Sequence, residues 1–309
     1  MLRGQFRPEF VGAVVIAYQQ DISLLSRLVQ RLLFLKLGAV VIVNNGDGSL
    51  AVDDLLPHRA SSRDALSGAV HVLSPGLNLG VAGGLNLGVR QLEQLGCSLA
   101  WSFDQDSLPD PGALTMLLDE WSRNPEVAAL APNAFVQGRA APLPFLLSNP
   151  AGAISATILT EPGDVVAAIT SGFLCRVDAW NAVGGAFEPL FIDHVDTDLC
   201  FRLRSAGWRI RAVPSARIGH HLGSPGPRLA FVLGPHTTLR SPMRTYYMLR
   251  NGWLLGRTEY APPGWRKYQR WQAMKIFVVA LLHGPARMHQ LAAMLRAFRD
   301  ALIRPELKR

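Results

Sequence analysis

The chain has 309 residues, of which 49% are hydrophobic and 17% charged, enough apolar sequence for one large α/β domain with an appendage or for two modest domains. This composition excludes an intrinsically disordered chain, and no apolar run reaches the roughly 18 residues of a membrane-crossing helix. The formal net charge is +8, but residues 236–309 alone hold 14 Lys and Arg against three acidic residues.

The first segments alternate between strand and helix patterns. Residues 11–17 form a continuous, β-branched apolar run, typical of a strand buried on both faces; without a cleavage site, it is expected to be a strand and not a signal peptide. Leucines within residues 24–35 recur at helical spacing, and residues 39–43 predict a second strand that ends at Asn44-Asn45-Gly46. This order predicts a βαβ unit with a polar loop after its second strand.

The next polar segments also follow predicted strands. Residues 70–73 form a short strand pattern that opens into the glycine-rich segment 78–86, where small residues would let a ligand approach the backbone. The spacing of Leu85, Val89 and Leu92 then predicts a helix. A fourth strand, residues 99–103, runs into Asp104-Gln105-Asp106-Ser107, and a helix is expected over residues 113–121. In open α/β sheets ligands bind at the carboxyl ends of strands, so these loops predict a binding site.

The second half is less regular. Residues 141–168 predict a loop with one or two strands, followed by an acid-rich segment that contains Asp193, Asp196 and Asp198. The segment is followed by a short helix to Ala206 capped by Gly207, a strand over residues 208–213 and a turn at residues 214–217.

The three cysteines, Cys97, Cys175 and Cys200, have no zinc or redox spacing and are expected to be reduced thiols.

Two carboxylates of this chain are one residue apart after a strand. Asp104 and Asp106 suit a hard divalent ion such as Mg or Mn, whose coordination a diphosphate would complete. Taken alone, an Asp-x-Asp pair is more often a solvated turn or a helix start than a metal site. The glycine-rich segment 78–86 lacks the spacing and position of a dinucleotide fingerprint, so NAD is not expected.

Taken together, the motifs resemble the inverting family 2 glycosyltransferases of the GT-A fold. The resemblance covers roughly residues 10–255, through segments 14–18, 41–46, 78–86, 103–107 and 171–220 in that order. Three motifs are similar to the rhamnosyltransferase branch: Asp104-Gln105-Asp106-Ser107, Phe191-Ile192-Asp193-x-Val195-Asp196, and Arg244-x-Tyr246-Tyr247-x-x-Arg250-Asn251.

The resemblance implies an α/β fold with a mixed, mostly parallel sheet flanked by helices. It implies a GT-A catalytic domain over residues 1–235 and a basic, amphipathic helical region over residues 236–309 that packs on it. The activity implied is inverting transfer of a sugar, rhamnose from dTDP-rhamnose, to a hydroxyl of a growing, lipid-linked polysaccharide.

The resemblance also implies roles for individual residues. Asp196 is expected to be the general base that takes the proton from the acceptor hydroxyl, with Asp193 and Asp198 orienting or capping. Asp106 and His220, beside His221, are the expected metal ligands. The expected donor-binding residues are Tyr18, Asn44, Asn78, Asn86, Asp104 and Arg250, with Arg244 as a further candidate for the diphosphate. The family usually has Asp where this chain has Asn44, which changes the expected contact to the nucleotide base.

Two other functions remain open at this point. A sugar nucleotidyltransferase also binds nucleotide and metal on such a sheet, but it needs an early Gly-rich, basic triphosphate loop, and residues 17–25 do not supply one. A non-catalytic basic protein that binds membranes or nucleic acid is the second alternative. Nucleic acid is not an expected partner, because no recognition motif accompanies the basic charge.

The basic C-terminal region has a composition suited to a membrane surface. Trp265, Tyr268 and Trp271 lie at spacings of three with basic residues between them, which is typical of helices in the headgroup region of an anionic membrane. Core-packed helices with solvated outer faces are the alternative. We therefore expect a cytoplasmic protein in peripheral contact with the inner face of the cell membrane.

Overall fold

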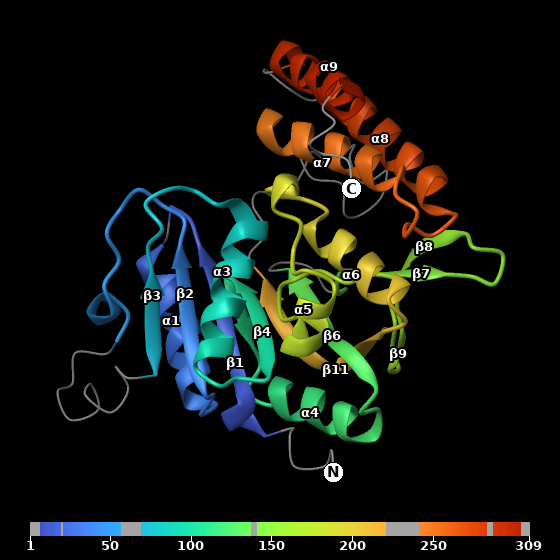
Figure 1. The fold of residues 1–309 in the computed structure, drawn as a ribbon. Helices are drawn as coiled ribbons and strands as arrows, with labels where there is room; N and C mark the ends of the chain where they lie inside the picture. Colours follow the sequence, from blue (N-terminus) through green and yellow to red (C-terminus); the bar gives the residue numbers. More distant parts are fainter. Residues whose placement is uncertain are drawn as a thin grey trace.

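The computed structural model describes residues 7–19, 21–56, 69–136, 141–220, 241–282 and 287–303 (Figure 1). The helices are α1 (Ile22–Phe34), α3 (Gly80–Gln94), α4 (Ala113–Arg123), α5 (Val177–Ala182), α6 (Val195–Ser205), α7 (Pro242–Leu255), α8 (Trp265–Leu282) and α9 (Arg287–Ile303). The strands of the main sheet are β1 (Val11–Ala17), β2 (Ala39–Asn44), β3 (Val70–Leu73), β4 (Leu99–Asp104), β5 (Ser107–Pro109), β6 (Val127–Val136), β9 (Gly163–Asp164), β10 (Leu174–Arg176) and β11 (Arg209–His220). A separate antiparallel pair consists of β7 (Phe145–Ser148) and β8 (Ile154–Thr157).

The main sheet is mixed and mostly parallel on its amino-terminal side, as predicted. Its order within the described residues is β3-β2-β1-β4-β10-β6-β11-β5, with β9 pairing onto β11. β3, β2, β1 and β4 are parallel neighbours, and β10 is antiparallel to both β4 and β6. The carboxyl ends of β1, β2 and β4 therefore lie side by side, and the polar loops that follow them share one edge of the sheet.

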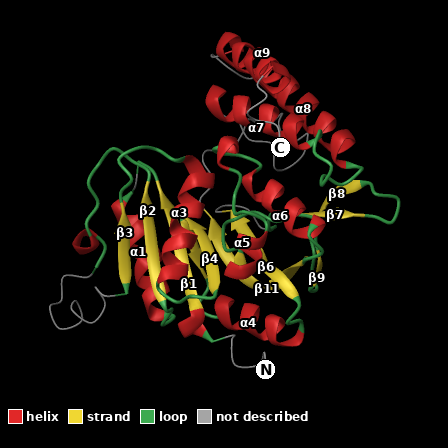
Figure 2. Ribbon diagram, viewed as in Figure 1, coloured by secondary structure: helices red, strands yellow, loops and turns green. Residues whose placement is uncertain are grey.

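Helices cover both faces of this sheet (Figure 2). The alternation of side chains along each strand sends Val11, Ala13 and Val15 to the face covered by α1 and α4. Val14 and Ile16 point to the opposite face, where they pack with residues of α3, α5 and α6. Both faces of β1 are thus buried, which explains its uninterrupted apolar sequence.

Helix α3 begins earlier than the sequence pattern indicated. The spacing of Leu85, Val89 and Leu92 predicted the helix only from about Leu85, but α3 already starts at Gly80, whose φ is +67°. A Cβ on Gly80 would meet Phe191, and one on Gly88 would meet Val14. The glycines therefore allow close packing of α3 against β1 and the 191 region.

Three parts of the second half also differ from expectation. Strand β6, central in the sheet, had no counterpart in the sequence prediction, and residues 141–168 contain three short strands where one or two were expected. Residues 214–217, expected as a turn, lie inside β11, where the register with β6 shifts between Val213 and Arg217. A β-bulge accommodates Pro214 without ending the strand.

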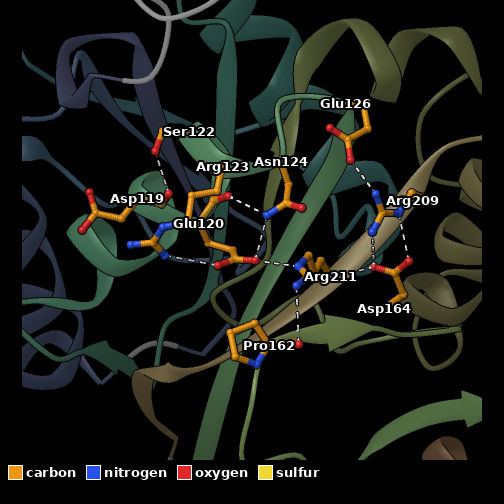
Figure 3. A network of polar contacts seen from close by, with 10 residues as sticks. All are labelled: Asp119, Glu120, Ser122, Arg123, Asn124, Glu126, Pro162, Asp164, Arg209 and Arg211. Atoms are coloured by element: carbon orange, nitrogen blue, oxygen red, sulfur yellow. Dashed lines mark hydrogen bonds and ion pairs between the residues drawn. The ribbon is translucent and has the colours of Figure 1, made fainter.

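Ion pairs hold the amino end of β11 (Figure 3). Arg211 contacts the buried Glu120 of α4 at 2.5 Å and Asp164 of β9 at 3.2 Å, and Arg209 pairs with Asp164 at 2.9 Å and with Glu126. Burial would raise the pKa of Asp164, but the two guanidinium groups outweigh it and lower that pKa. The network fixes the strand whose far end carries His220.

The C-terminal helices pack against one another and against the sheet domain. Leu249 of α7 is buried with Met294 and Ala297 of α9, and Ser241 caps α7 by accepting a hydrogen bond from the Arg244 N–H. Trp265, expected at a membrane surface, is instead fully buried beside Phe201, whereas Trp271 is 53% exposed. Among the described helices, none combines the length and apolar content needed to cross a bilayer.

Candidate active site

Two carboxylates lie at the end of β4 and in the turn that follows it, and this turn is anchored to the end of β1. Between Asp104 and Asp106, the Gln105 side chain accepts a hydrogen bond from the Tyr18 N–H at 3.0 Å and donates one to the Tyr18 carbonyl at 3.1 Å. The Gln105 N–H also donates to the Ile16 carbonyl at 3.2 Å. The residue between the two aspartates therefore fixes the direction in which both leave the sheet.

Asp104, Asp106 and His220 form one group. A ligand atom from each lies within 4.8 Å of the other two. Antiparallel pairing of β5 with β11 places Ser107 opposite His220; the Ser107 hydroxyl contacts His220 Nδ1 at 3.0 Å, and Asp106 Oδ1 lies 3.4 Å from the same nitrogen. The buried Ser171 hydroxyl donates to Asp104 Oδ2.

This donor set fits a divalent metal ion. Two carboxylates and one imidazole within 4.8 Å of one another supply hard oxygen ligands and one nitrogen. His220 is largely buried, and its pairing with Ser107 holds the ring in place. Mg and Mn ions prefer six ligands, so an ion held by Asp106 and His220 would retain positions for oxygens of a phosphate group. His221 lies outside the described residues.

Asp196 lies in the first turn of α6 and faces the same region as Asp104. Burial, together with the negative charges of Asp193 and Asp104, raises the pKa of Asp196 to about 6 despite hydrogen bonds from Thr197. The Thr197 N–H donates to Asp196 Oδ1 at 2.7 Å. A carboxylate with a pKa near 6 is ionised at neutral pH yet basic enough to accept a proton, which suits a general base.

The segment before α6 adopts an unusual backbone conformation. Phe191, Asp193 and His194 have φ values of 64°, 62° and 61°, a region that residues other than glycine rarely occupy. The buried Asn251 side-chain amide donates to the carbonyls of Leu190, Ile192 and Asp193 at 2.8–2.9 Å. One side chain of α7 thus stabilises three carbonyls of this strained segment, which precedes Asp196.

Arg250 and Arg244 extend the same contact between α7 and the acidic segment. Arg250 is buried, donates to the Pro189 carbonyl at 2.7 Å and lies over the Tyr247 ring at 4.7 Å. Arg244 makes two hydrogen bonds of 2.7 Å to Asp193. Burial opposes the charge of Arg244, but Asp193, Asp104 and Asp196 raise the pKa of its guanidinium. The structure thus brings Arg244, Asp193, Asp104 and Asp196 into one electrostatic cluster.

Asp198, the third acid of the segment, is fully buried. It pairs with Arg202 at 2.6 Å and accepts a hydrogen bond from the Tyr260 hydroxyl at 2.7 Å. These contacts join α6 to the segment between α7 and α8, so both oxygens of this buried carboxylate are used in structural contacts.

The remaining predicted donor residues occupy two kinds of position. Tyr18 is 46% exposed, and Asn78 is also exposed, with its side chain accepting from the Gly80 N–H at 2.8 Å. Asn44 is only 1% exposed and bonds within its own loop, donating to the Gly48 carbonyl at 2.7 Å. Asn86 bonds to both main-chain groups of Ala186 and to Glu188. Contacts of Asn44 and Asn86 with a donor therefore remain predictions, and the contacts observed for both are internal.

Several positioning residues had no role in the sequence prediction. Gln105, Ser107, Ser171 and Asn251 were quoted as parts of motifs, but spacing alone did not indicate their partners. Asn45 was treated as part of a polar loop, yet it is buried and donates to the Gly80 carbonyl at 2.8 Å, which joins the end of β2 to α3. The sequence did offer one signal for such contacts, because a polar residue at the end of a buried strand needs a hydrogen-bond partner.

Comparison with known proteins shows the family. A family model described as glycosyl transferase family group 2 matches residues 102–302, which include the Asp104 turn, Asp196, His220 and the C-terminal helices. The chain belongs to glycosyl transferase family group 2. The family predicted from the motifs is therefore confirmed.

Two curated relatives of this glycosyltransferase are rhamnosyltransferases by name. The chain is 27% identical to the dTDP-rhamnosyl transferase RfbF of Shigella flexneri over 82% of its own length and 81% of that protein. It is 31% identical to the N-acetylglucosaminyl-diphospho-decaprenol L-rhamnosyltransferase of Mycobacterium tuberculosis over 49% of its own length and 59% of that relative. The rhamnosyltransferase-like branch indicated by the motifs agrees with these names.

Among solved structures, the chain is similar to GalNAc-T7, crystallised with UDP, GalNAc and Mn2+. The TM-score is 0.59 at 15% sequence identity, with 95% of this chain and 56% of that chain covered. At this identity the likeness concerns the fold alone, and it confirms the predicted GT-A architecture of the family 2 glycosyltransferase.

Proposed function

We propose that this family 2 enzyme transfers rhamnose from dTDP-rhamnose to a hydroxyl of a lipid-linked glycan and inverts the anomeric centre. The observation that carries the proposal is the placement of Asp196, with its raised pKa, within electrostatic reach of the Asp104, Asp106 and His220 group. The relatives named above support the choice of rhamnose and of a lipid-linked acceptor.

The proposed reaction needs one carboxylate on the acceptor side and a cluster of ligands on the leaving-group side. Asp196 accepts the proton of the acceptor hydroxyl while that oxygen attacks the anomeric carbon and the bond to the diphosphate breaks. Thr197 fixes one Asp196 oxygen through its N–H, which leaves the second oxygen for the acceptor. A single displacement without a protein nucleophile inverts the configuration.

Asp106 and His220 are the proposed metal ligands, and Asp104 is proposed to lie beside the nucleotide ribose. A bound Mg or Mn ion would offset the negative charge that develops on the leaving diphosphate. Gln105 and Ser107 contribute by holding the carboxylates and the imidazole in place. A divalent ion is the supported conclusion, and Mg and Mn remain equal candidates.

The proposed donor contacts follow the exposure of each side chain. Tyr18 and Asn78, both exposed at the carboxyl edge of the sheet, are proposed to contact the nucleotide directly. Asn44, Asn86 and Arg250 are proposed to act by shaping the loops that contact it, because their polar atoms bond to neighbouring main-chain groups. Arg244 is more exposed than Asp193 and is the proposed partner for an anionic substrate group.

We further propose that residues 1–235 form the catalytic domain and that residues 236–309 form a basic helical region packed on it. The charge of this region and the lipid-linked substrate in the name of the mycobacterial relative support peripheral contact with an anionic membrane from the cytoplasmic side. Nucleic acid is not a proposed partner.

A panel of purified nucleotide sugars, with and without Mg or Mn, tests the donor. Binding of the true donor stabilises the folded protein, so dTDP-rhamnose with metal should raise the melting temperature more than other nucleotide sugars do. Stabilisation by a UDP-hexose and not by dTDP-rhamnose would reject rhamnose while leaving glycosyl transfer in place.

A further inference from the structure

A pocket of about 430 Å³ lies between the three C-terminal helices. This volume is within the range of small-molecule sites. Its described lining comprises Leu249, Gly252, Trp253, Gly256, Arg257, Arg266, Gln269, Arg270, Ala273 and Phe298. None of these residues belongs to the proposed transfer site, so a ligand in this pocket would be a different molecule from the nucleotide sugar.

The pocket is lined by three arginines, and no acidic residue is among its described lining. The Arg257 guanidinium donates to the Ala301 carbonyl at 3.1 Å, and Arg266 donates to the Gly256 carbonyl. Within the described part of the chain, Arg270 has no hydrogen bond or ion pair. Guanidinium groups bind phosphate oxygens through paired N–H donors, so the charge of this pocket suits a phosphate.

Two polar atoms of the lining are buried without a partner among the described residues. They are the indole N–H of Trp253 and the Oε1 atom of Gln269, a residue only 7% exposed. Buried polar atoms normally have hydrogen-bond partners. The indole is a donor for a phosphate or ester oxygen, and Oε1 is an acceptor for a hydroxyl. The remaining wall is apolar, which suits a hydrocarbon chain.

The surface around the pocket suits a lipid bilayer. On α8, Trp271, Met274 and Phe277 are exposed at spacings of three; on α9, Met288, Leu295 and Leu302 are exposed at spacings of seven. Each set lies along one face of its helix. Lys275 lies between Met274 and Phe277, and Arg296 and Arg299 lie between Leu295 and Leu302. This pattern is typical of helices that lie in the interface plane of a membrane.

We propose that this pocket binds the phosphate headgroup of an anionic phospholipid, with the phosphate at Arg270 and the start of one chain along Leu249 and Phe298. The proposal gives a site to the membrane contact proposed above and rests on it, but not on the identity of the sugar or on the transfer chemistry. Since α7 also carries Asn251, the lipid would contact the helix that holds the acidic segment of the active site.

Binding of the full chain to vesicles tests the proposal, with phosphatidylcholine alone compared to phosphatidylcholine mixed with phosphatidylglycerol. Ala273→Trp fills the pocket without changing the charge, and Arg270→Gln removes the arginine that has no described partner. Lys267→Gln is the matched control, because Lys267 is exposed on the same helix and does not line the pocket. Melting temperatures report whether each variant folds.

We expect phosphatidylglycerol-dependent binding that Ala273→Trp and Arg270→Gln each weaken about tenfold. Lys267→Gln should weaken it no more than about fivefold, the contribution of one basic residue near an anionic surface. Unchanged binding by a folded Ala273→Trp variant, or equal losses for Arg270→Gln and Lys267→Gln, would overturn the pocket in favour of diffuse charge attraction. If Ala273→Trp does not fold, the difference in vesicle binding between Arg270→Gln and Lys267→Gln decides whether the pocket binds the lipid.

Inorganic phosphate separates the lipid from a free anion. If phosphate alone raises the melting temperature of the wild type but not of Arg270→Gln, and vesicles do not bind, the pocket takes a free phosphate and the lipid assignment is wrong. Phosphatidylglycerol-dependent binding of the wild type that Arg270→Gln weakens supports the lipid assignment. No nucleotide sugar is present, so a wrong donor assignment would leave the result unchanged.

Discussion

Arg244 of α7 and Asp193, just before α6, make two parallel hydrogen bonds of 2.7 Å. Asp193 is almost fully buried, whereas the Arg244 side chain is 41% exposed. The pair connects the basic C-terminal helices to the acidic segment of the active site, and Arg244 also feels the charges of Asp104 and Asp196. A helix outside the sheet therefore influences the protonation of the proposed base.

Replacement of this arginine should be visible in the pH profile. Arg244→Gln removes a cation from the acidic cluster, so the pKa of Asp196 should rise further and the acidic limb of kcat/KM should move to higher pH. The buried Asp193 also loses charged hydrogen bonds, which should cost about 2 kcal/mol of stability. Arg204→Gln, on the exposed side of α6, is the control. An unshifted pH profile in a folded Arg244→Gln variant would contradict this coupling.

Asn251→Asp should disrupt the segment before α6 with almost no change of volume. The substitution replaces the N–H donors that reach the carbonyls of Leu190, Ile192 and Asp193 by acceptors, so unfolding should become easier by at least about 3 kcal/mol. In protein that still folds, kcat should fall while the KM for the donor stays the same, because Asn251 positions the acidic segment. Asn149→Asp keeps its acceptor role towards the Ala153 N–H and should change neither quantity.

The raised pKa of Asp196 predicts opposite effects of pH on activity and stability. The base must be ionised, so kcat/KM should rise with pH and level off above about pH 6.

The folded state retains a proton at the Asp196 carboxyl that the unfolded chain releases near its ordinary pKa of 3.8, so stability should fall as pH rises between these values. Asp196→Asn should therefore raise the melting temperature at pH 7 and leave it unchanged at pH 3, while Asp119→Asn on the exposed face of α4 should not change it. A lowered melting temperature for Asp196→Asn at pH 7 would contradict the burial of an ionised carboxylate.

Metal dependence should reside in the group formed by Asp104, Asp106 and His220. Asp106→Asn and His220→Ala should each abolish the stabilisation that Mn with dTDP gives to the wild type, measured by titration calorimetry and thermal unfolding. Asp110→Asn, an exposed carboxylate a few residues later, should behave as the wild type. Retention of metal-dependent nucleotide binding by both Asp106→Asn and His220→Ala would place the metal elsewhere.

Sequence patterns predicted local structure well wherever one strong period dominated. The bounds of β1 and β3 agree with the pattern, because an apolar run between polar residues leaves little freedom. The start of α3 and the course of β11 through Pro214 were wrong, because tertiary packing against Val14 and Phe191, and pairing with β6, outweigh the intrinsic preferences of glycine and proline.

In the candidate site, too, the sequence predicted individual residues but not the contacts that depend on tertiary packing. The sequence indicated Asp104, Asp106, Asp196 and His220, since acidic pairs and strand ends are visible in a chain. The contacts of Asn251 to residues about sixty positions away, and those of Gln105 to Tyr18, depend on how segments meet in space. Trp265 and Trp271 belong to the same sequence pattern, yet Trp265 is buried and Trp271 is exposed.

The central claim is an inverting transfer of rhamnose with Asp196 as the base. The most direct measurement incubates the full chain with dTDP-rhamnose, Mg or Mn and a diphospho-lipid-linked N-acetylglucosamine acceptor, and determines the anomeric configuration of the product by NMR. The account predicts a rhamnoside of configuration opposite to the donor, formed about 10²–10⁴-fold more slowly by Asp196→Asn, which still binds donor. A product of retained configuration, or undiminished transfer by Asp196→Asn, would contradict it.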